Sequence, residues 1–298
     1  MSNPGGPLAW ADFWREDQGN GGGCLAIAGS ELGASQTALW QDFAGSLPKG
    51  AQVLDLGTGD GIILRIMGSR RPDLRLTGVD SAPFLPPAKG KMRLQANVAM
   101  EQLPFADGRF AAVASQFGYE YGDTGRAAAE VCRVLASGGR FLFLVHRSDG
   151  PIVTHNQWRT AALRWAAVDS GLLDRARTLA VTRQTLPIST PASFAEAVRE
   201  AAAKFPQDSV AVEIAQAVMQ SLGPGLSPGD SLAALAEIDR KAKSELLRLD
   251  ALARAARDEP GAAALVAELR SVGLSAEAPA AVCNRSGEPY AWKLAGGA

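Results

Sequence analysis

The chain has 298 residues, 47% of them hydrophobic, and a formal net charge of −1. This length allows a substantial core in one or two domains, and the near-zero charge offers no positive field for a phosphate backbone, so we expect no nucleic-acid partner. The three cysteines lie far apart and there are only two histidines, which argues against a disulfide framework or a zinc site and favours a cytoplasmic location. No apolar run is long enough to span a bilayer and the N-terminus lacks a secretory pattern, so we expect neither secretion nor a membrane partner.

The first half of the chain alternates helix and strand patterns. Leu39, Phe43 and Leu47 recur at helical spacing behind Ser35, which predicts an amphipathic helix that is capped by this serine. Short apolar runs that end in glycine or aspartate, or are bounded by turn residues, predict buried strands, with helices between several of them. The predicted strands cover 51–57, 74–80, 92–98, 109–117 and 140–146. Strands that alternate with helices indicate a parallel α/β sheet.

Residues 151–260 show no strand pattern and several capped helices. One is predicted to begin at the cap Thr190, and the longest runs from after Asp230 to Pro260. We interpret this segment as a helical insertion that is either a lid over a substrate or a dimer surface, because its apolar faces need something to pack against. The α/β pattern resumes over 261–298 with a helix and two strands that can pair as an antiparallel end of the sheet.

A glycine-rich stretch, VLDLGTGDG, joins the first predicted strand to the next helix. Gly57 and Gly59 let the backbone approach a ligand closely, and the helix start adds N–H groups that are not used within the helix. Asp80 ends the following strand, where a carboxylate can bind the two hydroxyls of a ribose. Asp55 adds a negative charge that would not favour a pyrophosphate but would favour a cationic nucleoside such as S-adenosylmethionine. The alternatives are a plain tight turn and an NAD-binding α/β oxidoreductase, although the spacing is GxGxG rather than the dinucleotide pattern GxGxxG.

The segment SQFGYEY follows the fourth predicted strand. It places Tyr119, Glu120 and Tyr121 beyond the carboxyl end of a strand, where ligands bind in parallel sheets. Two rings and a carboxylate can hold an amine or another cation; alternatively, one tyrosine packs in the core and Glu120 caps the following helix. His146 ends the fifth strand and is either a general base for a hydroxyl acceptor or a residue that orients the adjoining loop. These four residues are the predicted catalytic residues.

Together these motifs resemble those of the class I S-adenosylmethionine-dependent methyltransferases. VLDLGTGDG resembles their first motif, LTGVD their ribose-binding second strand, LPFADGRFAAVASQFG the region of their fourth strand, and EVCRVLASGGRFLFLVH their fifth helix and strand. The LPF, RVL and GGR elements are most similar to the branch typified by ubiquinone and menaquinone biosynthesis methyltransferases. The resemblance covers residues 49–147 and the closing strands. It implies a Rossmann-like, doubly wound, seven-stranded α/β sheet that is mostly parallel with an antiparallel C-terminal strand, here with a large helical insertion.

The resemblance also implies roles for individual residues. Gly57, Thr58 and Gly59 would line the methionine portion of S-adenosylmethionine, Asp80 would bind the ribose, and Asp55 would orient the ammonium. The family commonly has an acidic residue for the adenine amine where this chain has Ala99, so either the backbone around Ala99 and Met100 or the side chain of Asn97 would have to serve. The predicted cofactor-binding residues are Asp55, Gly57, Thr58, Gly59, Asp80, Ala99, Met100 and Gln116.

The function that follows is methyl transfer from S-adenosylmethionine to a small-molecule acceptor, as N- or O-methylation by in-line displacement. A non-catalytic S-adenosylmethionine-binding module is a further alternative. The expected domains are an N-terminal helical cap (1–48), the cofactor-binding core (49–150), the insertion (151–260) and a C-terminal helix with strands (261–298). The insertion also offers a surface for a homodimer.

Overall fold

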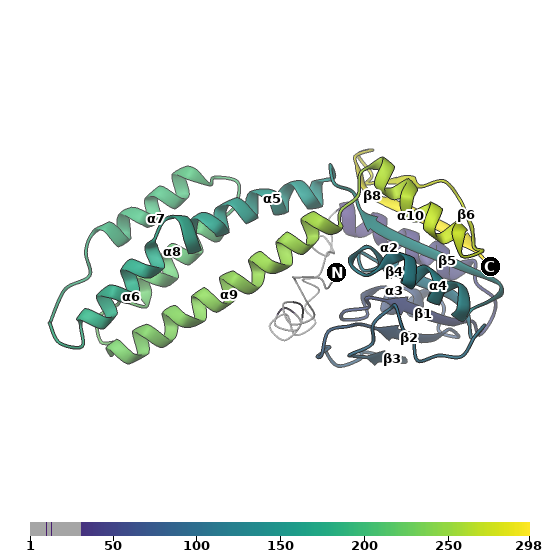
Figure 1. Ribbon diagram of the computed structural model, residues 1–298, viewed down its shortest axis with the longest axis horizontal. Helices are drawn as coiled ribbons and strands as arrows, with labels where there is room; N and C mark the ends of the chain where they lie inside the picture. The colour runs from purple at the N-terminus through teal and green to yellow at the C-terminus, as the bar shows by residue number, and fades with distance from the viewer. Residues whose placement is uncertain (1–9, 11–12, 14–30) are drawn as a thin grey trace. The chain divides into compact units, whose positions relative to one another are not determined.

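The computed structural model describes Trp10, Phe13 and residues 31–298, and it divides the chain into two compact units (Figure 1). The first unit comprises Met1–Val153 and Ala251–Ala298, and contains the sheet. The second unit, Thr154–Asp250, contains only helices and the loops that join them. The four-part domain division expected from the sequence stays a prediction.

The described strands of the first unit form one mixed sheet. Its order is β3-β2-β1-β4-β5-β8-β6, and β7 also pairs with β8. The five strands from β3 to β5 in this order are parallel, whereas β8 is antiparallel to β5. The strands are β1 (Gln52–Leu56), β2 (Arg75–Val79), β3 (Met92–Gln95), β4 (Phe110–Gln116), β5 (Leu135–His146), β6 (Ser275–Ala276), β7 (Ala280–Cys283) and β8 (Pro289–Gly297).

This topology confirms the predicted fold class of a mostly parallel sheet with an antiparallel C-terminal strand. The strand count differs from the expected seven, because the sheet has eight strands. The additional strand is the short β6, in which Ser275 pairs with Gly297 at the end of β8.

Helices cover both faces of the sheet, as a doubly wound fold requires. On one face, Trp40 of α2 (Glu31–Gly45) and Ile63 of α3 (Ile62–Arg70) belong to the same buried apolar cluster. On the other, Val131 of α4 (Thr124–Val134) and Leu265 of α10 (Glu259–Ser271) share a second cluster. The predicted cap at Ser35 is wrong, because α2 begins at Glu31 and the Ser35 hydroxyl donates to the Glu31 carbonyl one turn earlier.

The carboxyl ends of the central strands lie side by side at one edge of the sheet. Asp55 of β1 pairs with Ala114 of β4, and Gln116 at the end of β4 pairs with Leu144 of β5. Residues at or just after these strand ends, including His146 as the last residue of β5, are therefore brought close together although they are far apart in the sequence. Ligands bind at this edge in open α/β sheets.

The second unit has its own apolar core, which includes Phe194, Val218 and Leu235. The predicted cap at Thr190 is wrong: α7 begins at Ser193, and the Thr190 hydroxyl donates to the Leu222 carbonyl at 2.9 Å. None of the helices among the described residues is long and apolar enough to cross a membrane. The helical segments are α5 (Pro151–Arg164), a π-helical turn (Trp165–Asp169), α6 (Leu172–Thr182), α7 (Ser193–Lys204), α8 (Val210–Gln220) and α9 (Pro228–Ala255).

Candidate active site

The glycine loop after β1 has the backbone conformation that its glycines allow. Gly57, Gly59 and Gly61 have φ values of +64°, +52° and +74°, a region that residues with a β-carbon rarely adopt. The loop is also tightly packed, since a β-carbon on Gly57 would lie 3.0 Å from the Cα of Gly118, two residues after β4. The glycine loop and the end of β4 therefore lie in direct contact.

Thr58 is buried and fixes the loop to the sheet rather than pointing outward. Its backbone N–H donates to the Val79 carbonyl at 2.9 Å and its hydroxyl donates to Oδ2 of Asp55 at 2.7 Å. A β-carbon on Gly78 would lie only 2.3 Å from the Thr58 hydroxyl oxygen, so this arrangement depends on glycine in β2. In this conformation Thr58 orients Asp55.

Asp55 is a buried carboxylate, and the charged groups that act on it among the described residues are negative. Burial raises its pKa well above the usual value; the hydrogen bond from Thr58 acts in the opposite direction, and the negative charges of Asp80 and Asp60 raise the pKa further. Its Oδ1 accepts no hydrogen bond from the described residues. The guanidinium of Arg65 pairs with Asp60 at 2.6 Å rather than with Asp55. A buried carboxylate in this state favours a cationic ligand, which would restore its charged form.

Asp80 follows β2 and faces the glycine loop. Its Oδ2 accepts from the Gly59 N–H at 3.0 Å and its Oδ1 from the Ala82 N–H at 2.9 Å. Burial raises the pKa of Asp80, and these two N–H groups oppose the increase. The side chain is half-buried, so the lone pairs not used by the backbone can reach a ligand.

The predicted adenine side of the site lies beside Asp80. Val98 donates its N–H to the Asp80 carbonyl at 2.9 Å, which places the exposed Ala99 and the half-buried Met100 next to the end of β2. Gln116 is held differently, because its Oε1 accepts from the Trp40 indole at 2.5 Å. These contacts are consistent with a nucleoside site that runs from the glycine loop past Asp80.

Beyond β4 the chain makes a short 3₁₀ turn, η1 (Tyr119–Tyr121), which separates the two tyrosines. Tyr119 is completely buried; its ring stacks on Phe143 at 4.6 Å and its hydroxyl donates to the Thr124 carbonyl at 2.9 Å. Burial, and to a lesser degree the charge of Glu268, raises the pKa of its phenol. This position does not support the catalytic role predicted for Tyr119, which serves as part of the core here.

Glu120 and His146 form a buried pair. Glu120 Oε1 lies 2.8 Å from Nδ1 of the imidazole and also accepts the His146 backbone N–H at 3.0 Å. Both side chains are almost fully buried, and Glu120 Oε2 accepts no hydrogen bond from the described residues. The predicted alternative for Glu120 as a helix cap is wrong, since Asp123 caps α4 by accepting from the Arg126 N–H at 3.1 Å.

Two aromatic rings contact the imidazole of this pair. Phe117 stacks on His146 with ring centroids 4.1 Å apart and planes inclined by 25°. Tyr121, which is half-buried, approaches His146 edge-on at 6.0 Å, and Trp10 lies edge-on to Tyr121 at 5.7 Å. The sequence also predicts Trp14 on the same face of a short N-terminal helix as Trp10, but Trp14 lies outside the described residues.

Two further residues of the site were not predicted from the sequence. Phe117 has a φ of +56°, and no periodicity in SQFGYEY indicates such a backbone. Arg257 returns from the end of α9 and donates its backbone N–H to the His146 carbonyl at 2.8 Å. The sequence predicts that the longest helix continues to Pro260, whereas α9 ends at Ala255 and Asp258 caps α10, so no signal placed Arg257 beside β5.

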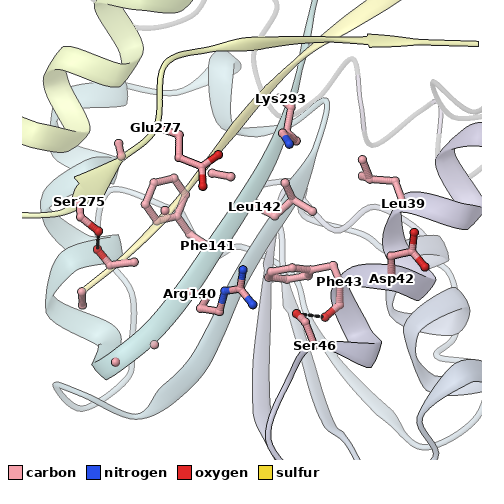
Figure 2. Close-up of a pocket in the computed structure, with 17 residues that line it drawn as sticks. Leu39, Asp42, Phe43, Ser46, Arg140, Phe141, Leu142, Ser275, Glu277 and Lys293 are labelled. Atoms are coloured by element: carbon pink, nitrogen blue, oxygen red, sulfur yellow. Dashed lines mark hydrogen bonds between the residues drawn. The ribbon is translucent and has the colours of Figure 1, made fainter.

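A cleft of about 710 Å³ lies elsewhere on the first unit (Figure 2). Leu39 and Phe43 of α2 face Arg140 and Leu142 of β5 across it, and Lys293 of β8 contributes a second positive charge. Arg140 precedes His146 by six positions, or about 20 Å along a strand. This cleft is therefore separate from the edge of the sheet where the glycine loop and the Glu120–His146 pair meet.

Comparisons with known proteins point to one family. Residues 54–143 match the family described as "Methyltransferase domain". The chain is 40% identical over 121 residues to a ubiquinone/menaquinone biosynthesis C-methyltransferase of Desulfotalea psychrophila, and that alignment covers 37% of this chain and 48% of the relative. It is 34% identical over 97 residues to a demethylmenaquinone methyltransferase of Thermotoga maritima, with coverages of 31% and 42%. The aligned region thus spans less than half of both curated relatives.

Among solved structures, the chain is similar to the 1,6-didemethyltoxoflavin-N1-methyltransferase of Burkholderia thailandensis. The TM-score is 0.46 and the sequence identity 13%, and the alignment covers 97% of this chain and 87% of that one.

Proposed function

We propose that the protein is a class I S-adenosylmethionine-dependent methyltransferase, whose family match covers residues 54–143, and that it transfers a methyl group to a small-molecule acceptor by N- or O-methylation. The observation that supports this best is the buried Glu120–His146 pair, which lies at the carboxyl ends of β4 and β5 beside the glycine loop. A cofactor held by the loop and an acceptor held by this pair would be neighbours.

The residues around the glycine loop fit the cofactor of this family. The positive-φ glycines allow close approach of the backbone. The buried Asp55, whose Oδ1 accepts no hydrogen bond from the described residues, suits a ligand that carries a positive charge. Asp80 has lone pairs left for the ribose hydroxyls, and Ala99 and Met100 would lie along the adenine. Bound S-adenosylmethionine would supply an activated methyl group on sulfur.

Glu120 and His146 would act on the acceptor. Because Glu120 occupies Nδ1, it favours the imidazole tautomer in which Nε2 can take a proton. Glu120 Oε2, which is buried and accepts no hydrogen bond from the described residues, can accept an N–H or O–H of the acceptor. An acceptor oriented in this way would have its lone pair directed at the methyl group, and most of the rate gain would come from alignment.

Access to this pair requires a side chain to move, since His146 is completely buried. The half-buried Tyr121 contacts the imidazole edge and is the natural candidate. A phenol ring in that place can also contact a flat or cationic acceptor through its face. Of the two tyrosines predicted for the site, Tyr121 is therefore the one we retain.

The test is a metabolite screen with S-adenosylmethionine labelled in its methyl group, using the wild-type protein and Glu120→Gln. We expect a labelled product whose mass and fragmentation identify N- or O-methylation, and a rate at least tenfold lower for Glu120→Gln, while calorimetry gives S-adenosylhomocysteine affinities within threefold of each other. The control is Glu277→Gln, which removes an exposed carboxylate from the β6–β7 connection.

Three outcomes would contradict the proposal. Tight binding of NADH without S-adenosylhomocysteine binding would indicate an oxidoreductase. Cofactor binding without transfer to any compound would indicate a non-catalytic binding module. A product methylated on carbon, the chemistry named for the Desulfotalea relative, would retain the enzyme class and refute N- or O-methylation. The homodimer and the cytoplasmic location stay predictions.

A further inference from the structure

Phe117 has a backbone conformation that is unusual for its side chain. Among the described residues, Phe117 and Asn97 are the non-glycine residues with positive φ, at +56° and +57°. Asparagine enters this region readily, whereas a bulky aromatic residue rarely does. Surrounding contacts must therefore hold Phe117 in this state, and strained positions of this kind cluster at functional sites.

These contacts come from three strands. The Phe117 N–H donates to the Leu144 carbonyl of β5 at 2.8 Å. The hydroxyl of Ser115 donates to the Leu56 carbonyl of β1 at 2.8 Å and accepts the Tyr119 N–H at 3.0 Å. Gly118 lies so close to β1 that a β-carbon there would be 2.9 Å from the Leu56 carbonyl oxygen. The turn after β4 is thus fixed on both sides of Phe117.

The result of this backbone geometry is the placement of one ring. The phenyl group of Phe117 is almost fully buried and stacks on the His146 imidazole at 4.1 Å. Three residues later, the same turn supplies Glu120, which lies at the Nδ1 edge of that imidazole. A face contact and an edge contact from one rigid turn together remove the rotational freedom of the imidazole ring.

We propose that Phe117 is a positioning residue for His146: its ring fixes the plane of the imidazole, so that Nδ1 stays on Glu120 and Nε2 stays directed at the acceptor. This inference rests on the proposed function, in which His146 takes a proton from the acceptor. The placement of the imidazole can be measured without methyl transfer, so the positioning role of Phe117 and the proposed methyltransferase function can be refuted separately.

The test uses nuclear magnetic resonance of the histidine side chains. The chain has two histidines, and a His155→Gln background leaves only the signals of His146. We expect the His146 Nδ1 proton, bonded to Glu120, to give a downfield signal that exchanges slowly with water. Phe117→Leu keeps an apolar side chain but removes the stacking plane, and we expect the signal to broaden or vanish and the transfer rate to fall at least tenfold. Phe117→Tyr keeps the plane and should behave like the wild type.

Phe143→Leu is the matched control, because Phe143 is also a buried, stacked phenylalanine of this sheet but lies on Tyr119. It should lower stability by a similar amount and leave the His146 signal in place. If Phe117→Leu does not fold, the same measurement is made on Phe117→Asn, because asparagine adopts a positive φ readily, as Asn97 does in this chain. An unchanged His146 signal in the Phe117 variant, or the same loss in Phe143→Leu, would overturn the proposal. If the wild-type protein transfers no methyl group, the proposed function fails while the signal still decides the role of Phe117.

Discussion

Replacing Asp55 by asparagine should stabilise the ligand-free protein at neutral pH and weaken cofactor binding. Asparagine keeps the shape of the side chain, and its carbonyl oxygen can still accept the Thr58 hydroxyl that lies 2.7 Å from Oδ2. The substitution removes a charge that is buried beside Asp80 and Asp60, both negative. Binding and stability therefore change in opposite directions, which a general structural defect would not produce.

The sign of the pH effect follows from the raised pKa of Asp55. A carboxyl group whose pKa is higher in the folded than in the unfolded state contributes its full stability below the unfolded pKa, about 4. That contribution is lost as the pH rises through the folded pKa. Each pKa unit of difference corresponds to about 1.4 kcal/mol in the free energy of unfolding. Above the folded pKa, Asp55→Asn should thus be more stable than the wild type by at least about that amount, and the difference should disappear near pH 4.

A cationic ligand reverses this balance because it favours the charged carboxylate. An opposite charge within about 4–6 Å typically shifts a carboxyl pKa by one to three units, so Asp55→Asn should weaken S-adenosylmethionine binding by about tenfold or more. The binding should also release a proton from Asp55 where this group is protonated without ligand. Calorimetry in two buffers of different ionisation enthalpy would detect that proton, and its signal should be absent in the variant.

The assay is urea unfolding of both proteins between pH 4 and pH 8. Asp60→Asn provides the contrast, since Asp60 is buried too but paired with Arg65 at 2.6 Å, and its replacement should lower the free energy of unfolding. If Asp55→Asn and the wild type show the same dependence of unfolding free energy on pH, Asp55 does not carry the effect and the reasoning is refuted.

Three other changes test separate parts of the site. Asp80→Ala should weaken S-adenosylhomocysteine binding at least tenfold, about 1.4 kcal/mol, and calorimetry showing unchanged affinity would contradict a ribose contact. Gly118→Ala should lower the unfolding free energy by about 1–3 kcal/mol, because its β-carbon would lie 2.9 Å from a backbone oxygen; an unchanged denaturation midpoint would show that the turn relaxes. Replacing residues 154–250 with a short linker should leave cofactor affinity within about tenfold and abolish transfer, and retained turnover would show that the helical unit is no lid.

The fold was predictable because its signals are local in sequence. Apolar runs bounded by glycine and aspartate located most of the central strands to within a few residues, and helices were expected between several of them. The sequence predicts that β5 begins at residue 140, because Gly138 and Gly139 indicate a turn. The strand instead begins at Leu135, which pairs with Phe110 of β4. Pairing between distant segments, which no local pattern encodes, decided that boundary.

The proposed cofactor side of the site could be inferred from local sequence, whereas the contacts of the proposed acceptor side could not. The glycine loop and Asp80 each carry their chemistry in a few adjacent positions. The Glu120–His146 contact joins residues 26 positions apart on neighbouring strands. Tyr119 and Tyr121 lie on a 3₁₀ turn, where neither the strand period nor the α-helical period decides which ring faces the core.

Both ends of the helical insertion are attached beside the proposed acceptor residues. The chain leaves the sheet directly after His146 and returns at Arg257, whose backbone bonds to His146 and to Ser148 at 2.8 and 2.9 Å. The Arg257 side chain also lies 3.4 Å from the Glu120 carbonyl oxygen. Both ends of the insertion are therefore fixed beside the Glu120–His146 pair, whereas the glycine loop and Asp80 are held by β1 and β2. We therefore expect substitutions at these attachment points to affect the proposed acceptor residues more than the strands that carry the proposed cofactor site.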